Sequence, residues 1–93
     1  MDRCLYITGR VQGVGFRYWT VLKAYSIGGL SGYAYNMENG DVVVLMSGSE
    51  EKMNELQAAL YKGPLFARVD SVEERPDLKS VFPPIIEGSF KRI

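Results

Sequence analysis

The chain has 93 residues, enough for one domain with a single core that needs neither disulfides nor a structural metal. Basic and acidic residues number 11 each, so the net charge is zero and the broad positive field typical of nucleic-acid or membrane-surface binding is absent. The single cysteine, Cys4, the lack of a signal-peptide pattern and the absence of a bilayer-length apolar run predict a cytoplasmic protein that does not bind a membrane.

The first half of the chain predicts a strand, a helix and a hairpin. A strand over residues 3–9 runs directly into the glycine-rich stretch "GRVQGVGFR" at 9–17. A helix follows from about residue 18 and ends at the glycine pair 28–29. Its apolar stripe is expected at Tyr18, Val21, Leu22 and Tyr25. Two strands then flank "MENG", where Asn39-Gly40 predicts a type I′ turn.

The second half predicts one more helix and two more strands. Ser49 is a candidate N-cap, with Glu50 and Glu51 favouring the positive end of the helix dipole. The core-facing stripe of this helix is Met53, Leu56 and Leu60, and the helix ends near residues 62–64.

A fourth strand is expected over residues 66–74. Val69 and Val72 lie three apart there, so both can face the core only if the strand carries a bulge or a break. A loop at 75–84 and a last strand over 85–93 complete the chain.

This order of elements is a split βαβ arrangement. We therefore expect an α+β fold, a ferredoxin-like sandwich in which an antiparallel sheet carries two helices on one face, with residues 1–93 forming a single domain. The fold alone does not decide the function, because this architecture supports RNA-binding modules, metal carriers, regulatory domains and enzymes.

The glycine-rich stretch has two interpretations. Gly9, Gly13 and Gly15 could serve only to turn the chain sharply. Alternatively, the stretch forms an anion site, because it enters a helix N-terminus where unpaired N–H groups point outward, and because Arg17 there opposes the helix dipole unless an anion is bound. Neither the Walker loop nor the dinucleotide fingerprint is present.

Several catalytic chemistries are excluded by composition. The chain contains no histidine, which removes His-containing triads and imidazole bases, and one cysteine cannot make a zinc site. Cys4 and Arg10 match the Cys-x5-Arg spacing of cysteine-dependent phosphatases, but the intervening residues are expected to be extended, which separates the two ends by close to 20 Å at roughly 3.3 Å per residue. The acidic residues near the hairpin and the second helix are interpreted as solvated surface: Glu38, Asp41, Glu50 and Glu51. We expect no metal and no cofactor.

Three segments together resemble the acylphosphatase family. They are "GRVQGVGFR" at 9–17, "GYAYNMENGDV" at 32–42 and "GPLFARVDSV" at 63–72, and the likeness runs from the first strand to the fourth. The departures are small: Ala34 and Ser31 stand where valine and threonine are frequent, and "FKRI" lacks the aromatic terminal residue of many members.

The resemblance implies hydrolysis of the carboxyl-phosphate bond of an acyl phosphate to a carboxylate and inorganic phosphate. Carried over by position, Arg17 would grip the phosphoryl group and Asn36 would hold the attacking water. The phosphate cradle would be the main chain of Gln12, Gly13, Val14, Gly15 and Phe16. A carboxylate leaving group needs no proton donor, so a site without histidine suits this reaction.

Two alternatives belong to other classes. An RNA-binding module shares the expected topology, and Tyr33 and Tyr35 share one strand face, but the third strand lacks the aromatic motif and the net charge is zero. A phosphate-binding domain of a larger carbamoyl-phosphate-using enzyme is the second alternative, against which the chain length favours a free-standing enzyme. The expected partners are a small acyl phosphate and inorganic phosphate, as product and inhibitor, with no nucleic acid, and the protein is expected to be a monomer.

Overall fold

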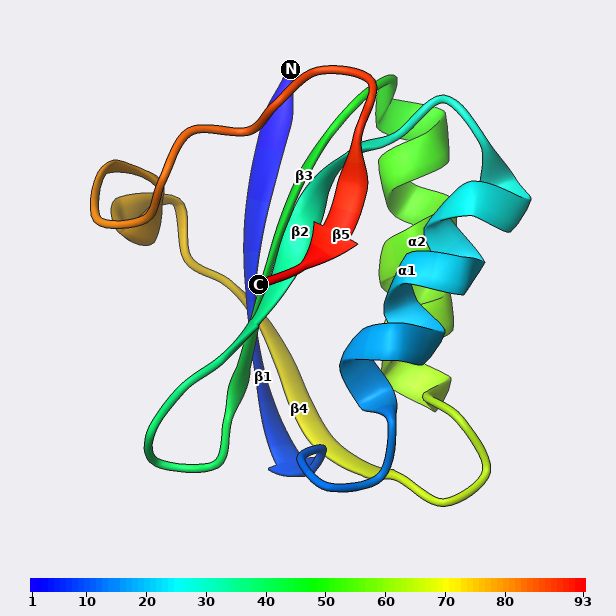
Figure 1. Cartoon of the computed structure of the whole chain (residues 1–93), viewed down its shortest axis with the longest axis vertical. Helices are drawn as coiled ribbons and strands as arrows, with labels where there is room; N and C mark the ends of the chain where they lie inside the picture. Colours follow the sequence, from blue (N-terminus) through cyan, green and yellow to red (C-terminus); the bar gives the residue numbers. More distant parts are fainter.

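The computed structural model describes all residues, 1–93, and places two helices against one face of a five-stranded sheet (Figure 1). The strands are β1 (Asp2–Arg10), β2 (Ser31–Asn36), β3 (Val42–Ser47), β4 (Arg68–Glu74) and β5 (Phe90–Arg92). The helices are α1 (Phe16–Ile27) and α2 (Glu50–Lys62), and a short 3₁₀ helix spans Pro76–Ser80. No helix has both the length and the apolar character needed to cross a bilayer.

The sheet order is β4-β1-β3-β2-β5, which is the predicted split βαβ order with one strand added at the edge. The pairs β4–β1, β1–β3 and β3–β2 are antiparallel, as expected, but β5 runs parallel to β2, so the prediction of a wholly antiparallel sheet is wrong at this edge. The last strand is also shorter than the predicted 85–93. Residues 75–89 run across the outer face of the sheet from β4 at one edge to β5 at the other (Figure 1). They bring Phe90, the first residue of β5, beside Gly32 near the start of β2, so the two strands run parallel.

The main core lies between the sheet and the helices. Inward-facing side chains of β1 and β3 meet the stripe of α2, which is the predicted one: Met53, Leu56 and Leu60 are fully buried. Helix α2 begins as predicted, because the Ser49 hydroxyl accepts a hydrogen bond of 3.2 Å from the N–H of Lys52.

The buried face of α1 differs from the predicted stripe. Tyr18, Leu22 and Tyr25 are at least half exposed, and the buried residues are Phe16, Thr20 and Ala24. The small side chains at 20 and 24 let the helix approach the core closely. Thr20 can be buried because its hydroxyl donates to the main-chain oxygen of Phe16 at 2.9 Å. The predicted buried face of α1 is therefore wrong, because the prediction counted its tyrosines as core residues.

The spacing of the two valines allowed a bulge or a break in this strand, and the structure has a bulge in β4. Thr8 pairs with Ser71 but the next residue, Gly9, pairs with Val69, so β4 carries one extra residue at this point. Val72 is buried and Val69 packs against the same core. Gly9 thus lies inside β1 and not in the turn, and any Cβ there would come within 2.1 Å of the Arg68 carbonyl oxygen.

The outer face of the sheet is covered by the segment between β4 and β5. Leu78, Phe82 and Ile85 pack on a small second cluster that includes Cys4 and Tyr33. The Tyr33 hydroxyl donates a 2.5 Å hydrogen bond to the main-chain oxygen of Pro83. Tyr33 is therefore unavailable for stacking against a nucleic-acid base, although the sequence placed it on one face with Tyr35.

Candidate active site

The sheet brings the glycine-rich loop and the end of β2 to the same end of the molecule (Figure 1). Ile7 of β1 pairs with Val42 of β3, and Val42 pairs with Asn36, the last residue of β2. The register thus aligns Ile7, Val42 and Asn36 across neighbouring strands. The loop that follows β1 lies just beyond this line, so the topology places it beside Asn36.

The loop between β1 and α1 is anchored at both ends and turned by glycines in between. Val11 and Phe16 are each only 1% exposed, and Val14 packs against the core from inside the loop. Gly13 and Gly15 have φ angles of 72° and 76°, a region that costs other residues energy. A Cβ at either glycine would meet no atom within 4 Å, so the backbone conformation and not crowding requires glycine there.

The main-chain N–H groups of this loop are unpaired. Those of residues 12–18 donate no hydrogen bond to a protein atom, and the first N–H of α1 that does is that of Trp19, to the Gly15 oxygen at 2.9 Å. Helix α1 also lacks a side-chain cap and has no acidic residue in its first turn, whereas α2 has both. Free donors and the positive end of the dipole make this end of α1 suited to an anion.

Arg17 lies in the first turn of α1 and is half-buried. Its Nη1 donates a 2.6 Å hydrogen bond to the main-chain oxygen of Ile93, which follows β5, and it has no carboxylate partner. Only one of the five guanidinium N–H groups is used by this bond. The remaining donors and the charge are free for a ligand.

Asn36 provides the second polar group. Its Oδ1 is buried and accepts no hydrogen bond from the protein. A buried carbonyl oxygen without a partner costs roughly 1–3 kcal/mol, so its retention at the edge of a pocket indicates a partner that is not part of the protein.

These groups line one pocket of about 170 Å³. Of the predicted site residues, the pocket brings together Gln12, Gly13, Gly15, Phe16, Arg17 and Asn36. Val14 is the exception, since its side chain packs toward the core and it does not line the pocket.

Arg92 also lines this pocket, although no sequence pattern selects it. Its guanidinium carbon lies 5.3 Å from the centre of the Tyr18 ring, a cation–π arrangement, and it too has no carboxylate partner. Arg92 reaches the site because β5 pairs with β2, opposite Ala34. Without that pairing, nothing near residue 92 in the sequence indicates an anion site.

The connection between β2 and β3 is not the predicted type I′ turn. Gly40 has a φ of 99°, but Asn39 does not have a positive φ, which a type I′ turn requires at both positions. Instead, Asn39 Oδ1 accepts a 3.0 Å hydrogen bond from the Asp41 N–H, and the Gly40 N–H donates to the Met37 oxygen.

A hydrogen-bond network fastens this connection to its neighbours. The Tyr6 hydroxyl donates to Asp41 Oδ2 at 2.7 Å and accepts from Asn39 Nδ2 at 2.9 Å, so Asp41 is not the solvated surface group expected from the sequence. The bond from Asn39 lowers the pKa of Tyr6, but the bond to Asp41 and burial raise it by more, and the hydroxyl stays protonated at neutral pH. From the glycine-rich loop, the side chain of Gln12 donates to the main-chain oxygens of Met37 and Asp41 at 2.6 and 2.9 Å.

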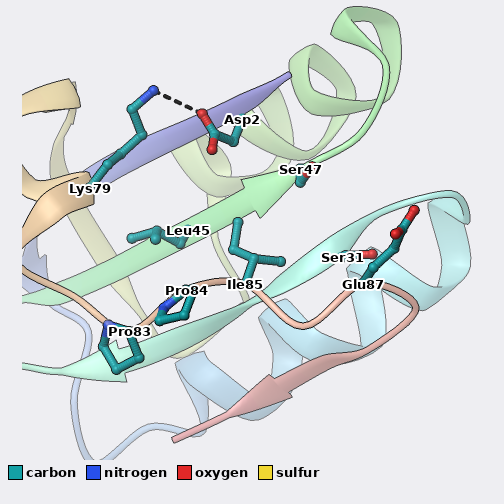
Figure 2. A pocket seen from close by; sticks show the side chains of 9 residues that line it. All are labelled: Asp2, Ser31, Leu45, Ser47, Lys79, Pro83, Pro84, Ile85 and Glu87. Carbon is teal, nitrogen blue, oxygen red and sulfur yellow. Dashed lines mark hydrogen bonds and ion pairs between the residues drawn. The ribbon is translucent and has the colours of Figure 1, made fainter.

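A larger hollow, of about 520 Å³, lies on the outer face of the sheet (Figure 2). Its polar lining includes the ion pair between Lys79 and Asp2, 2.8 Å apart. It contains none of the loop N–H groups and neither Arg17 nor Asn36, so we do not assign catalysis to this hollow despite its larger volume. No three His, Cys, Asp or Glu side chains gather where they could hold a metal ion.

Comparison with protein families gives one match over most of the chain. The family model described as Acylphosphatase matches residues 4–82. An acylphosphatase of Nitrobacter winogradskyi is 46% identical over 74 residues, which cover 80% of this chain and 74% of that protein. An acylphosphatase of Caldanaerobacter subterraneus subsp. tengcongensis is 51% identical over 71 residues, covering 76% of this chain and 78% of that protein.

Solved structures give the same result for the fold. The crystal structure of acylphosphatase from Bacillus subtilis superposes with a TM-score of 0.78 at 30% identity, over 99% of this chain and 97% of that one. The crystal structure of HypF from T. kodakarensis superposes with a TM-score of 0.78 at 28% identity, over all of this chain but only 12% of that one. The same fold thus occurs both as a chain of this length and as a small part of a much longer chain.

Proposed function

Because this chain belongs to the acylphosphatase family and hydrolyses acyl phosphates, we propose that it does so by in-line attack of a water molecule on a phosphoryl group bound at the N-terminus of α1. The observation that carries this mechanism is the convergence of three unsatisfied features on one pocket. They are the unpaired N–H groups of residues 12–18, the uncompensated guanidinium of Arg17 and the unpartnered Oδ1 of Asn36.

The phosphoryl oxygens are held by the loop and by Arg17. N–H donors at a helix start stabilise the charge on the equatorial oxygens, and phosphoryl transfer needs mainly such positioning and electrostatic stabilisation. The planar guanidinium can bind two phosphoryl oxygens at once, which the point charge of a lysine cannot. Because its bond to Ile93 uses a single N–H, Arg17 can engage a phosphoryl group without giving up that support.

Asn36 holds the attacking water. Its Oδ1 accepts a hydrogen bond from the water and so directs an oxygen lone pair toward phosphorus. The departing carboxylate is a weak base and leaves without a proton, so the reaction needs no general acid. The site accordingly works with an amide, a guanidinium and main-chain N–H groups, in a chain that has no histidine.

The RNA-binding alternative has less support. The face that would stack bases is covered by residues 75–89, with Tyr33 only 4% exposed. We also propose that the enzyme acts as a monomer in the cytoplasm. Every residue of the proposed site comes from one chain, and the buried free thiol of Cys4 suits a reducing compartment.

The mechanism is tested by phosphate release from acetyl, carbamoyl and benzoyl phosphate, with inorganic phosphate as inhibitor. Inorganic phosphate should inhibit competitively against each substrate, because it occupies the same N–H groups and Arg17. Inhibition that lowers kcat and leaves KM unchanged would place phosphate at another site and contradict the proposal. The relative kcat/KM values for the three substrates would also show whether the pocket favours a small or a bulky acyl group.

Turnover should also be independent of metal ions. No cluster of acidic or sulfur ligands lines the pocket, and the positive charge that a metal would supply comes from Arg17 and the helix end. Activity should therefore be the same before and after dialysis against a chelator. Loss of activity that magnesium restores would contradict this expectation.

A further inference from the structure

The side chain of Gln12 joins the two halves of the active site. Gln12 belongs to the loop that follows β1, and its Nε2 donates hydrogen bonds of 2.6 Å to the main-chain oxygen of Met37 and 2.9 Å to that of Asp41. Met37 directly follows Asn36 in the chain, and Asp41 directly precedes Val42, the residue that pairs with Asn36. One amide group thus holds both ends of the connection between β2 and β3.

We propose that Gln12 is a positioning residue for Asn36, which sets the attacking water relative to the phosphoryl group through these two hydrogen bonds. The inference rests on the role proposed above for Asn36. It differs from the cradle role expected for residue 12, which used only its main-chain N–H, because here the side chain acts and its partners are in the other loop.

The need for such a tie follows from the local structure. Asn36 Oδ1 makes no hydrogen bond to the protein, so no polar contact fixes the oxygen that would hold the water. Its position depends on its main chain, which lies at the very end of β2 where strand pairing stops. The Gln12 bonds restrain that main chain from the same loop that binds the phosphoryl group, so the water site and the phosphate site share a reference point. A misplacement of about 1 Å at a reacting group can cost on the order of 10²-fold in rate.

The fold itself does not depend on these bonds. The Asp41 oxygen also accepts a 2.8 Å hydrogen bond from the Met37 N–H, and the Met37 oxygen also accepts from the Gly40 N–H at 3.2 Å. Both carbonyls therefore keep a partner when the Gln12 amide is removed. The Tyr6 bonds to Asp41 and Asn39 also remain, so the hairpin is retained while its tie to the phosphate loop is lost.

The test is a double-mutant cycle on kcat with benzoyl phosphate, using Gln12→Met and Asn36→Ala. Methionine keeps the length of the side chain and removes the donor. Gln12→Met alone should lower kcat by about 10-fold to 10²-fold and leave KM and the inhibition constant of inorganic phosphate within about twofold. In the Asn36→Ala background the same change should lower kcat by less than about twofold, because Gln12 acts through Asn36.

A matched control is Gln57→Met. Gln57 lies in α2 and accepts a 2.7 Å hydrogen bond from Arg3, away from the pocket, so the same substitution there should leave kcat unchanged. Thermal unfolding of every variant shows whether it is folded. If Gln12→Met does not fold, Gln12→Asn replaces it in the cycle, because it keeps the amide but is one methylene too short to reach both carbonyls.

Three results would overturn the inference: an unchanged kcat in Gln12→Met, equal losses in both backgrounds, or a rise in KM and in the phosphate inhibition constant with little change in kcat. The last would mean that Gln12 serves the phosphate cradle. If Asn36→Ala itself kept normal turnover, the role of Asn36 would be wrong and this inference would fall with it. Loss of turnover in Asn36→Ala with a normal Gln12→Met would overturn this inference alone.

Discussion

Arg17 and Ile93 are joined by a 2.6 Å hydrogen bond from the guanidinium to the main-chain oxygen, which links the first turn of α1 to the end of β5. Ile93 is in turn held by its own N–H, which donates to the Ala34 oxygen at 2.9 Å. Arg17 is therefore supported from the edge of the sheet, at a position two residues along β2 from Asn36.

Replacing Arg17 should weaken both substrate binding and the chemical step. In the proposed mechanism the guanidinium contacts the phosphoryl group in the bound substrate and in the transition state, so Arg17→Gln should raise KM, lower kcat and weaken phosphate inhibition together. A charge-assisted hydrogen bond contributes about 1.5–3 kcal/mol, which corresponds to roughly 10-fold to 10²-fold in kcat/KM. The kcat/KM of Arg17→Lys should lie between those of the wild type and Arg17→Gln, because lysine keeps the positive charge but lacks the planar guanidinium that binds two oxygens. A change confined to kcat would mean that Arg17 does not bind the ground state.

Replacing Asn36 should separate activity from stability. Asn36→Ala should lower kcat by on the order of 10²-fold if its bond to water contributes about 3 kcal/mol, with KM and phosphate inhibition near wild type. The free energy of unfolding should stay the same or rise by up to about 1 kcal/mol, because the change removes a buried oxygen without a partner. Kinetics and denaturant unfolding on the same preparation measure both. Marked destabilisation would show that the Asn36 amide is structural. Asn54→Ala, the same substitution in α2, is the control for both kcat and the free energy of unfolding.

Replacing Arg92 should weaken anion binding by a smaller factor. Its guanidinium lines the pocket but is exposed, and exposed charges contribute about 0.2–1 kcal/mol. Arg92→Gln should therefore raise the phosphate inhibition constant by up to about fivefold at low salt, and the difference should shrink as salt is added. Lys91→Gln removes the same charge from the neighbouring residue, which points to the other face of β5, and should have little effect. Equal effects of the two variants would assign the result to net charge alone.

Cys4 should be dispensable for catalysis, and ionisation of its thiol should lower stability only at high pH. Burial, and then the nearby Asp77 charge, raise the pKa of the Cys4 thiol to about 11 from an ordinary value of 9.0. The thiol is therefore protonated at neutral pH and is a poor nucleophile, so Cys4→Ala should keep normal turnover.

The sign of the pH effect follows from the raised pKa. Because the folded state holds its proton more tightly than the unfolded state, the stabilisation is complete below pH 9 and is lost as the pH rises toward about 11. The wild type should lose about 2 kcal/mol more unfolding free energy than Cys4→Ala between about pH 8 and about pH 10.5. Denaturant titrations at the two pH values measure this difference, and parallel losses in both proteins would contradict it.

Features whose causes are local can be predicted from the amino-acid sequence alone. The glycine pair 28–29 at the end of α1 and the Ser49 cap at the start of α2 depend on a few neighbouring residues, and each predicted its helix end correctly. The three-residue spacing of Val69 and Val72 called for a bulge or a break, and the structure has a bulge. The resemblance of residues 9–17 and 32–42 to the acylphosphatase family selected Arg17 and Asn36 as site residues. The structure brings both to one pocket, and their catalytic roles stay a prediction.

Other features depend on which residues face each other in the folded chain, and sequence patterns did not predict them. The predicted buried face of α1 is wrong because apolar residues occur all around this helix. The close packing of the helix on the core buries Phe16, Thr20 and Ala24 and leaves the tyrosines exposed. The three-residue β5 has little signal of its own; its pairing with β2 sets its direction and brings Arg92 to the pocket. The Gln12 side chain meets Met37, 25 positions away, only because β3 lies between β1 and β2. Local signals reach about one turn of chain, whereas these contacts join residues that only the completed sheet makes neighbours.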